Sequence, residues 1–195
     1  MDAIPSHIRG LIFDFDGTLA DTMPLHWRAW QEIAARHGFN FTEQRFYALG
    51  GVPSREILKQ LKREQGLNLD PNTVGIEKEE AYLRLLDEVN PIPEIVAIVR
   101  AQIGRRPMAV ASAGTRRVIE RVIERLGLRS FFQAVVTNDD VTRPKPAPDA
   151  FLEAARQLGV PPEACLAYED TDLGLQAIRA AGMEAVDVRQ LLQRR

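Results

Sequence analysis

The feature that most constrains the fold is a regular alternation of apolar runs and amphipathic segments from Pro91 onward. Short apolar runs predict strands, and four of them lie at residues 108–111, 134–136, 165–168 and 185–188. Apolar residues recur at helical spacing between these runs, as in the stripe of Val118, Ile119, Val122, Ile123 and Leu126. Strands that alternate with helices of this length predict a parallel sheet with helices on both faces.

One more apolar run lies near the N-terminus, from Ile8 to Phe13, and it stops at Asp14-Phe15-Asp16-Gly17-Thr18. A short apolar run that ends at a glycine turn is typical of a buried parallel strand. We therefore expect this strand to join the same sheet. The fold class predicted is α/β, with a Rossmann-like parallel-sheet core.

Residues 22–90 carry helix signals and little strand signal. Prolines suit the first turns of helices and glycines suit their ends, which marks two segments at residues 24–38 and 53–66. Asp70 and Pro71 form the cap and first turn of a third helix. This stretch is therefore predicted to be an all-helical insertion.

The chain is thus predicted to hold two domains. Residues 1–21 and 91–195 form the α/β catalytic core, and residues 22–90 form a helical cap. We expect the cap to close over the core by hinge movement near residues 20–23 and 89–93.

Composition restricts the range of partners. The formal net charge of −2 gives no electrostatic reason to expect nucleic acid or an anionic membrane surface. No window approaches the roughly 18 apolar residues that a membrane span needs, and residues 1–9 carry no secretion signal. The single Cys165 cannot form an intrachain disulfide and is expected to be a small buried residue. We expect a cytoplasmic monomer with no nucleic-acid or membrane partner.

Polar side chains follow four of the predicted strands at the points where the strands end. In chain order these residues are Asp14 with Asp16, Ser112, Lys145, and Glu169 with Asp170. The carboxyl ends of parallel strands meet at one edge of a sheet, which is where ligands bind in such folds. The sequence therefore predicts that four carboxylates, a hydroxyl and an ammonium share one site.

These residue types indicate phosphoryl transfer assisted by a metal ion. Clustered carboxylates repel one another and stay ionised most easily beside a cation, and an all-oxygen set suits Mg²⁺. The Ser112 hydroxyl and the Ala113 amide, at the start of a helix, can donate hydrogen bonds to phosphate oxygens. Lys145 can place a positive charge on the same anion.

One carboxylate of such a site can form an aspartyl-phosphate, and a second can protonate the leaving group and then deprotonate water. Less specific interpretations stay open for each motif alone. Asp14-Phe15-Asp16-Gly17 has the composition of a turn, and Glu169-Asp170 could be acidic residues near a helix N-terminus. Their common placement at strand ends favours the catalytic interpretation.

The segment Asp14-Phe15-Asp16-Gly17-Thr18-Leu19 resembles the first motif of the haloacid dehalogenase superfamily. Ser112, the Lys145-Pro-Ala-Pro-Asp segment and Glu169-Asp170 resemble its second, third and fourth motifs, and the resemblance covers the chain from Ile8 onward. It implies that Asp14 is the nucleophile and Asp16 the general acid/base. It also implies a metal held by Asp14, the Asp16 carbonyl and Asp170, with support from Glu169.

Within the superfamily the chain is similar to the β-phosphoglucomutase and sugar-phosphate phosphatase subgroup. His26 lies at mutase-like spacing, and the segment 51–56 resembles a cap loop whose arginine, Arg55, grips a second phosphate. Lys78 lies where the subgroup often has a cap lysine that faces the site. His26 could equally serve packing, and Arg55 and Lys78 could equally be exposed charges.

The C-terminal half is similar to bacterial fructose-1-phosphate phosphatases, notably at residues 104–110 and 180–183. The resemblance implies hydrolysis of small sugar phosphates, such as fructose 1-phosphate or 6-phosphogluconate, through an aspartyl-phosphate. The alternative is a β-phosphoglucomutase that interconverts β-glucose 1-phosphate and glucose 6-phosphate.

Two departures from the mutase pattern favour the phosphatase. Gly114-Thr115-Arg116 stands where mutases carry Ser-Lys-Asn, and Arg143-Pro144 replaces small residues before Lys145. Dehalogenation is less favoured, because it needs neither Mg²⁺ nor an acid at Asp16. A non-catalytic sugar-phosphate binding protein is also less favoured, because such proteins usually lose at least one of the acids that this chain retains.

Overall fold

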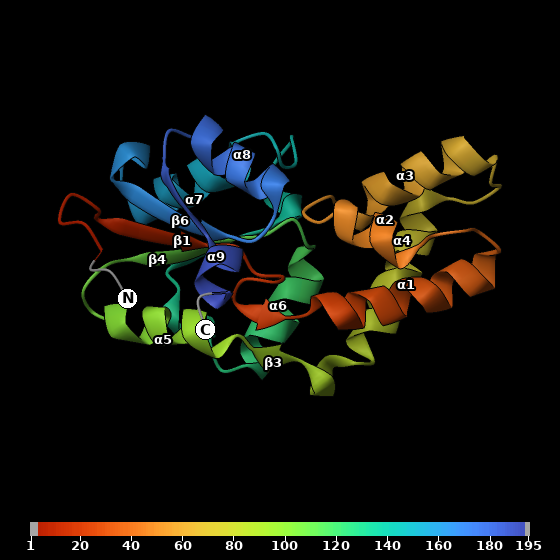
Figure 1. Ribbon diagram of the computed structural model, residues 1–195, viewed down its shortest axis with the longest axis horizontal. Coiled ribbons are helices and arrows are strands. Elements are labelled where there is room, and N and C mark those ends of the chain that lie inside the picture. Colours follow the sequence, from red (N-terminus) through yellow and green to blue (C-terminus); the bar gives the residue numbers. More distant parts are fainter. Residues whose placement is uncertain (1–3, 194–195) are drawn as a thin grey trace.

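A computed structural model describes residues 4–193, which form two lobes (Figure 1). One lobe is built on a parallel sheet and the other on the helices α1 to α4. The predicted fold class, an α/β parallel-sheet core with an inserted helical cap, is confirmed. Among residues 4–193, no helix has both the length and the apolar character needed to cross a membrane.

The sheet has five parallel strands in the order β5-β4-β1-β6-β7. Their bounds are β1 Gly10–Phe13, β4 Met108–Ala111, β5 Ala134–Val136, β6 Cys165–Glu169 and β7 Glu184–Asp187. The first four are fully buried, which explains why they read as continuous apolar runs. In the central register Phe13 lies opposite Val110 on one side and Tyr168 on the other, so the three strands end within one residue of the same level.

Helices cover both faces of the sheet (Figure 1). Their bounds are α5 Pro93–Gln102, α6 Arg116–Arg125, α7 Asp149–Leu158, α8 Asp172–Ala180 and α9 Val188–Leu192. Leu11 and Phe13 belong to the core on the α5 and α6 side, whereas Ile12 belongs to the core on the α7 and α8 side. This alternation along β1 follows from the two-residue period of a strand.

The helical lobe contains α1 Met23–His37, α2 Glu43–Ala48, α3 Ser54–Gln65 and α4 Pro71–Leu83. Its ends follow the predicted signals. Gly66 ends α3 in the left-handed conformation, with φ of 64°, and the Asp70 carboxylate accepts hydrogen bonds from two amides at the start of α4. The lobe has its own buried side chains, among them Trp30 and Tyr82.

The two chain crossings between the lobes lie side by side. β2 (Ala20–Asp21) pairs antiparallel with β3 (Asn90–Pro91). Sequence reasoning did not predict this ladder, because a two-residue strand has no periodicity to detect. The division into a core of residues 1–21 and 91–195 and a cap of residues 22–90 stays a prediction. Residues 1–3 and 194–195, which include the start of the segment 1–9, lie outside the described residues.

Several strand boundaries differ from the predicted ones. β1 begins at Gly10 rather than Ile8, and β6 continues through Glu169. The last strand ends at Asp187 rather than Val188, because the Asp187 carboxylate accepts a hydrogen bond from the Arg189 amide and thereby caps α9.

Candidate active site

The strand ends bring three acidic side chains together. Asp14 follows β1, and its amide donates a 2.9 Å hydrogen bond to the Tyr168 carbonyl of β6. Glu169 ends β6 and Asp170 follows it, so neighbouring strands deliver all three carboxyls to one point. One carboxylate oxygen from each of Asp14, Glu169 and Asp170 lies within 4.8 Å of the others.

Lys145 joins this group from the loop after β5. Its ammonium lies 2.5 Å from Asp14 Oδ1 and 2.7 Å from Glu169 Oε2, and all three side chains are almost fully buried. Burial alone would lower the pKa of Lys145, but the charges of Asp14 and Glu169 outweigh it and hold the pKa above its usual value. Lys145 is therefore a fixed positive charge that orients both carboxylates.

Glu169 has hydrogen bonds on both oxygens. Oε2 accepts from Lys145, and Oε1 accepts from the amides of Asp170 and Thr171 and from the Thr171 hydroxyl. Its side chain also lies directly against Gly174 of α8, where an added Cβ would stand 1.9 Å from Oε2. An alanine at position 174 would therefore displace the hydrogen-bonded Glu169 carboxylate. The Glu169 carboxylate both orients Lys145 and binds the N-terminus of α8, as the helix-terminus interpretation predicts.

The acidic group fits a divalent cation. Burial, and then repulsion by Glu169, raises the pKa of Asp14 above its usual value and that of Asp170 to about 7. A cation relieves this repulsion, and a set of carboxylate oxygens suits a hard ion. The Asp16 carboxylate is not part of the group, so the predicted contribution of Asp16 rests on its main-chain carbonyl.

Gly17 allows the turn after Asp16 to pack closely against Asp170. Its φ of 85° lies in the left-handed region, and an added Cβ would stand 2.3 Å from Asp170 Oδ2. Thr18, the next residue, donates a 2.8 Å hydrogen bond to Asp170 Oδ1. The turn after Asp16 therefore packs directly onto the acidic group.

Asp16 points toward the helical lobe. Its Oδ1 accepts a 2.7 Å hydrogen bond from the Thr22 hydroxyl and lies 3.2 Å from His26 Nε2. The ammonium of Lys78 on α4 lies 2.8 Å from His26 Nδ1, and the imidazole stacks on Tyr82 with 3.8 Å between ring centroids. Because an ammonium only donates, Nδ1 accepts, and the proton on Nε2 is donated to Asp16.

The pKa values of Asp14 and Asp16 shift in opposite directions. Burial would raise the pKa of Asp16, but hydrogen bonds from His26 and Thr22 hold it below its usual value. Burial, together with the Lys78 charge, lowers the pKa of His26, and burial lowers the pKa of Lys78 to about 8. Asp16 is thus held ionised, whereas the pKa of Asp14 is raised.

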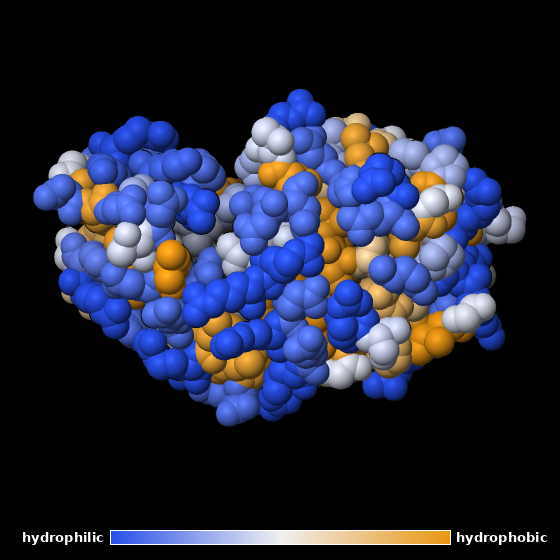
Figure 2. Space-filling model, turned by 180° about the vertical axis from the view of Figure 1, so that it is seen from behind, coloured by the Kyte–Doolittle hydropathy of each residue, from blue (hydrophilic) through white to orange (hydrophobic). Residues whose placement is uncertain are grey.

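A cavity of about 120 Å³ lies between the sheet edge and the helical lobe, a volume suited to a small ligand. Its wall includes, from the core, Asp14, Asp16 and Glu169 and, from the helical lobe, His26, Arg55 and Lys78. Figure 2 shows the notch between the two lobes from the opposite side, on a largely hydrophilic face.

The structure gathers most predicted site residues at this cavity, although their catalytic and binding roles stay predictions. Ala113 lines the cavity, whereas Ser112 is buried at the end of β4, where its hydroxyl accepts a 3.0 Å hydrogen bond from the Gly114 amide. Lys78 is 4% exposed, so its interpretation as an exposed charge is wrong. Arg55 is exposed but lines the cavity at the start of α3.

Several polar residues of the cavity wall were missed by sequence reasoning, among them Glu79, Thr115 and Asn138. Glu79 follows Lys78 on α4, Thr115 precedes α6, and Asn138 comes shortly after β5. Asn138 could have been found by the strand-end rule that found Lys145. Glu79 could not, because only the packing of α4 decides which of its side chains face the core.

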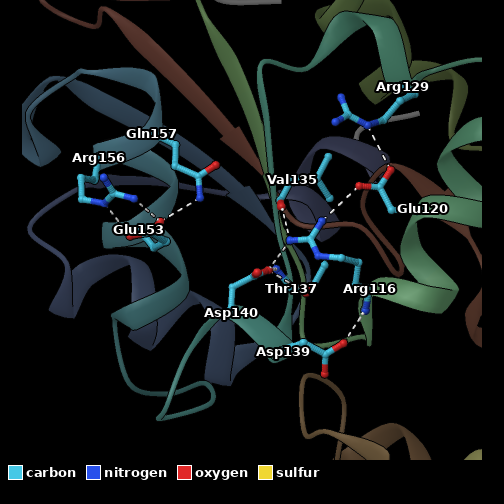
Figure 3. Close-up of polar contacts among 10 residues, drawn as sticks. All are labelled: Arg116, Glu120, Arg129, Val135, Thr137, Asp139, Asp140, Glu153, Arg156 and Gln157. Carbon is cyan, nitrogen blue, oxygen red and sulfur yellow. Dashed lines mark hydrogen bonds and ion pairs between the residues drawn. The ribbon is translucent and has the colours of Figure 1, made fainter.

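Arg116, one of the departures from the mutase pattern, fastens the loop after β5 to α6 (Figure 3). Its guanidinium donates to the Val135 carbonyl at 3.1 Å and to Asp140 at 2.6 Å, and its amide donates to Asp139 at 2.9 Å. Arg143, the other departure, forms hydrogen bonds with Asp149. Among the described residues, neither arginine lines the cavity.

Comparisons with known proteins agree with this geometry. The model of the haloacid dehalogenase-like hydrolases matches residues 8–182. The chain is 46% identical over 183 residues to the fructose-1-phosphate phosphatase YqaB of Escherichia coli (strain K12), covering 93% of this chain and 97% of that protein. It is 30% identical over 190 residues to the beta-phosphoglucomutase of Bacillus subtilis (strain 168), covering 94% of this chain and 84% of that protein.

A solved structure, that of CbbY from Rhodobacter sphaeroides in complex with phosphate, matches with a TM-score of 0.82 at 29% identity. The match covers 91% of this chain and 84% of that chain. Together with the relatives, it confirms the resemblance that the sequence motifs indicated.

Replacement of Gly174 by alanine tests the contact with Glu169. The new methyl group would displace the Glu169 carboxylate and with it Lys145, so we expect Gly174→Ala to lower the free energy of unfolding by about 1–3 kcal/mol. A displacement of Lys145 by about 1 Å would also slow catalysis by roughly 100-fold. Urea unfolding and steady-state rates measure the two effects.

The matched control is Gly75→Ala in α4, where the nearest atom to an added Cβ is Leu58 Cδ1 at 3.8 Å. It should raise stability by about 0.5–1 kcal/mol, since alanine is the better helix former. Equal effects of the two substitutions would contradict the assigned contact.

The buried Lys78 makes stability depend on pH. Its pKa is about 8 in the folded protein against a usual 10.5, so the unfolded chain binds more protons between these values and stability rises with pH across them. At pH 7 the charged ammonium is destabilising. We therefore expect Lys78→Met to raise the free energy of unfolding by about 1–3 kcal/mol at pH 7, with a smaller gain at pH 10.

Urea unfolding at the two pH values measures this difference. Lys59→Met, at a half-exposed lysine of α3, should stay within about 0.5 kcal/mol of the parent protein at both. A loss of stability for Lys78→Met that is larger at pH 7 than at pH 10 would show that the ammonium is stabilising and would contradict the prediction.

Proposed function

The chain belongs to the haloacid dehalogenase-like hydrolases, and from this premise we propose that it is a Mg²⁺-dependent phosphatase of small sugar phosphates. The observation that carries the proposal is that Asp14 and Asp16, two residues apart in the sequence, have different hydrogen-bond partners on different lobes. Asp14 is paired with Lys145 in the core, whereas Asp16 accepts hydrogen bonds from Thr22 and His26. Such a division suits one nucleophile and one acid/base.

In the proposed reaction Asp14 attacks the phosphorus atom and forms an aspartyl-phosphate, while the phosphate ester bond breaks. Because Asp16 is held ionised, it first takes the Nε2 proton of His26, and the Lys78 ammonium replaces that proton at Nδ1. Asp16 gives this proton to the oxygen of the leaving sugar. It then takes one from the water that hydrolyses the intermediate, and this proton returns through His26 to Lys78.

Lys145 keeps the Asp14 carboxylate oriented, since its ammonium bonds Oδ1 at 2.5 Å. The Ala113 amide, before α6, would donate to a phosphate oxygen.

Asp14, Asp170 and the Asp16 carbonyl would hold the Mg²⁺, with Glu169 supporting the site through Lys145 and the amides of Asp170 and Thr171. When bound, the ion would neutralise the clustered carboxylates and the charge of the phosphate group. The raised pKa values of Asp14 and Asp170 support this proposal, because both carboxyls lack a neutralising charge sufficient to keep them fully ionised.

A mutase remains the second candidate, because Arg55 and Lys78 line the cavity from the helical lobe and could bind a second phosphate. Two observations favour the phosphatase. Lys78 is engaged with His26, and the chain is more similar to a fructose-1-phosphate phosphatase than to the mutase of Bacillus subtilis. Fructose 1-phosphate and 6-phosphogluconate are the substrates to test first, in a protein that we expect to be a cytoplasmic monomer.

Replacement of Asp14 by asparagine removes the proposed nucleophile. We expect Asp14→Asn to reduce phosphate release from fructose 1-phosphate by at least about 10⁴-fold, as loss of a covalent nucleophile does. Asp87→Asn is the control, because the Asp87 side chain is 96% exposed. Chelation of Mg²⁺ should abolish the activity of the parent protein, and added Mg²⁺ should restore it.

Phosphate released equally by parent and Asp14→Asn would contradict the proposal. Conversion of β-glucose 1-phosphate to glucose 6-phosphate, dependent on trace glucose 1,6-bisphosphate, would instead establish the mutase.

A further inference from the structure

Glu79 is a carboxylate of the cavity wall that phosphoryl transfer does not use. It lies on α4 beside Lys78, and its side chain is 16% exposed. Burial raises the pKa of Glu79, against the opposing effects of the Thr115 hydroxyl and of the Lys78 and Arg117 charges. An anion in this position repels phosphate, so its place in a phosphate-ester site calls for another explanation.

Thr115 faces Glu79 from the core. It stands at the N-cap position of α6, yet its hydroxyl makes no cap hydrogen bond. That oxygen is buried and has no hydrogen-bond partner of standard geometry within residues 4–193. The same hydroxyl interacts with the Glu79 carboxylate and lowers its pKa, so Thr115 helps to position Glu79 at the cavity wall.

The core wall around Thr115 is held in place. The Arg116 amide donates to Asp139 (Figure 3). The Asn138 amide donates to the Gly114 carbonyl at 3.0 Å, so both Thr115 and Asn138 are fixed at the cavity. An acceptor carboxylate on the helical lobe thus faces a hydroxyl and an amide side chain on the core. This combination recognises hydroxyl groups, which both donate and accept.

We propose that Glu79 is a specificity-determining residue that accepts hydrogen bonds from the hydroxyls of the sugar, opposite Thr115 and Asn138. Its charge also selects substrates whose end remote from the reacting phosphate is uncharged, and disfavours a second phosphate there. This inference rests on the proposed phosphatase function and names its substrate class, a monophosphate whose polyhydroxylated part is uncharged. Of the two substrates named above it favours fructose 1-phosphate over 6-phosphogluconate, whose carboxylate Glu79 would repel.

A contact between the lobes offers another role for Glu79. Arg117 of α6 lies 4.0 Å from Glu79 and 3.5 Å from Glu80, which is its neighbour on α4. The side chains of Arg117 and Glu80 are about half exposed, and exposed ion pairs of this kind contribute little. The closer partner is Glu80, so this ion pair does not explain a carboxylate at position 79.

Kinetics on matched substrates test the assignment. The variants are Glu79→Gln, with Glu80→Gln and Arg117→Gln as controls that remove the ion pair between the lobes. Three substrates are compared. Fructose 1-phosphate is the reference, p-nitrophenyl phosphate lacks sugar hydroxyls, and fructose 1,6-bisphosphate is fructose 1-phosphate with a second phosphate at its other end. Each variant is measured for kcat and KM with Mg²⁺ present.

Glu79→Gln should lower kcat/KM for fructose 1-phosphate by roughly 10-fold to 100-fold, mainly through KM, because a hydrogen bond to a charged group is lost. Hydrolysis of p-nitrophenyl phosphate should stay within about twofold of the parent protein. The ratio of kcat/KM for the bisphosphate to that for the monophosphate should rise at least about tenfold as the repelling charge disappears. Glu80→Gln and Arg117→Gln should reproduce none of these changes.

Three results would overturn the inference: equal losses on both monophosphates in Glu79→Gln, the same losses in the two control variants, or a parent protein that prefers the bisphosphate. In each case the enzyme could still be a sugar phosphatase. A parent protein that hydrolyses p-nitrophenyl phosphate but no sugar monophosphate would instead refute the proposed function, and the inference with it.

Discussion

The ion pairs of Lys145 with Asp14 and Glu169 are the interaction on which the rest of the site depends. A buried ammonium between two buried carboxylates is stable only when each charge keeps its partner, since removal of one leaves another unpaired. Asp14 follows β1, Glu169 ends β6, and Lys145 comes from the loop after β5, so the pairs join three separate segments. They hold the carboxylate of Asp14, the proposed nucleophile, at the edge of the cavity.

The second acid depends on the helical lobe. Asp16 is bound through His26 to Lys78, and both of these residues lie on helices of that lobe. The pKa of Asp16 is therefore governed by the position of α1 and α4, whereas the environment of Asp14 is set by the sheet. A movement of the helical lobe about the β2 and β3 crossings would change the surroundings of Asp16, the proposed acid/base, and leave Asp14, the proposed nucleophile, in place.

Much of the core could be predicted from sequence, because strand ends carry chemistry in this fold class and the strands are continuous apolar runs. Asp14, Lys145 and Asp170 could be placed at one edge without coordinates. The cavity wall of the helical lobe could be predicted only in part, because the family resemblance indicated His26, Arg55 and Lys78 but not Glu79. Lys78 and Glu79 lie on α4, whose sequence shows no clear apolar face, because its buried residues include Gly75, Lys78 and Tyr82. Which of its charges faces the core is decided by tertiary packing.

Trapping of the phosphorylated enzyme tests most directly that Asp14 is the nucleophile. In Asp16→Asn, p-nitrophenyl phosphate should still phosphorylate the protein, because its leaving group needs no proton, but hydrolysis of the intermediate lacks a base. The reaction is quenched with acid, and borohydride reduces the acyl phosphate. Peptide mass spectrometry then identifies the residue that had been phosphorylated. The account predicts homoserine at position 14 together with a burst of p-nitrophenolate. A burst with homoserine at another aspartate, or turnover with no trapped residue at all, would contradict it.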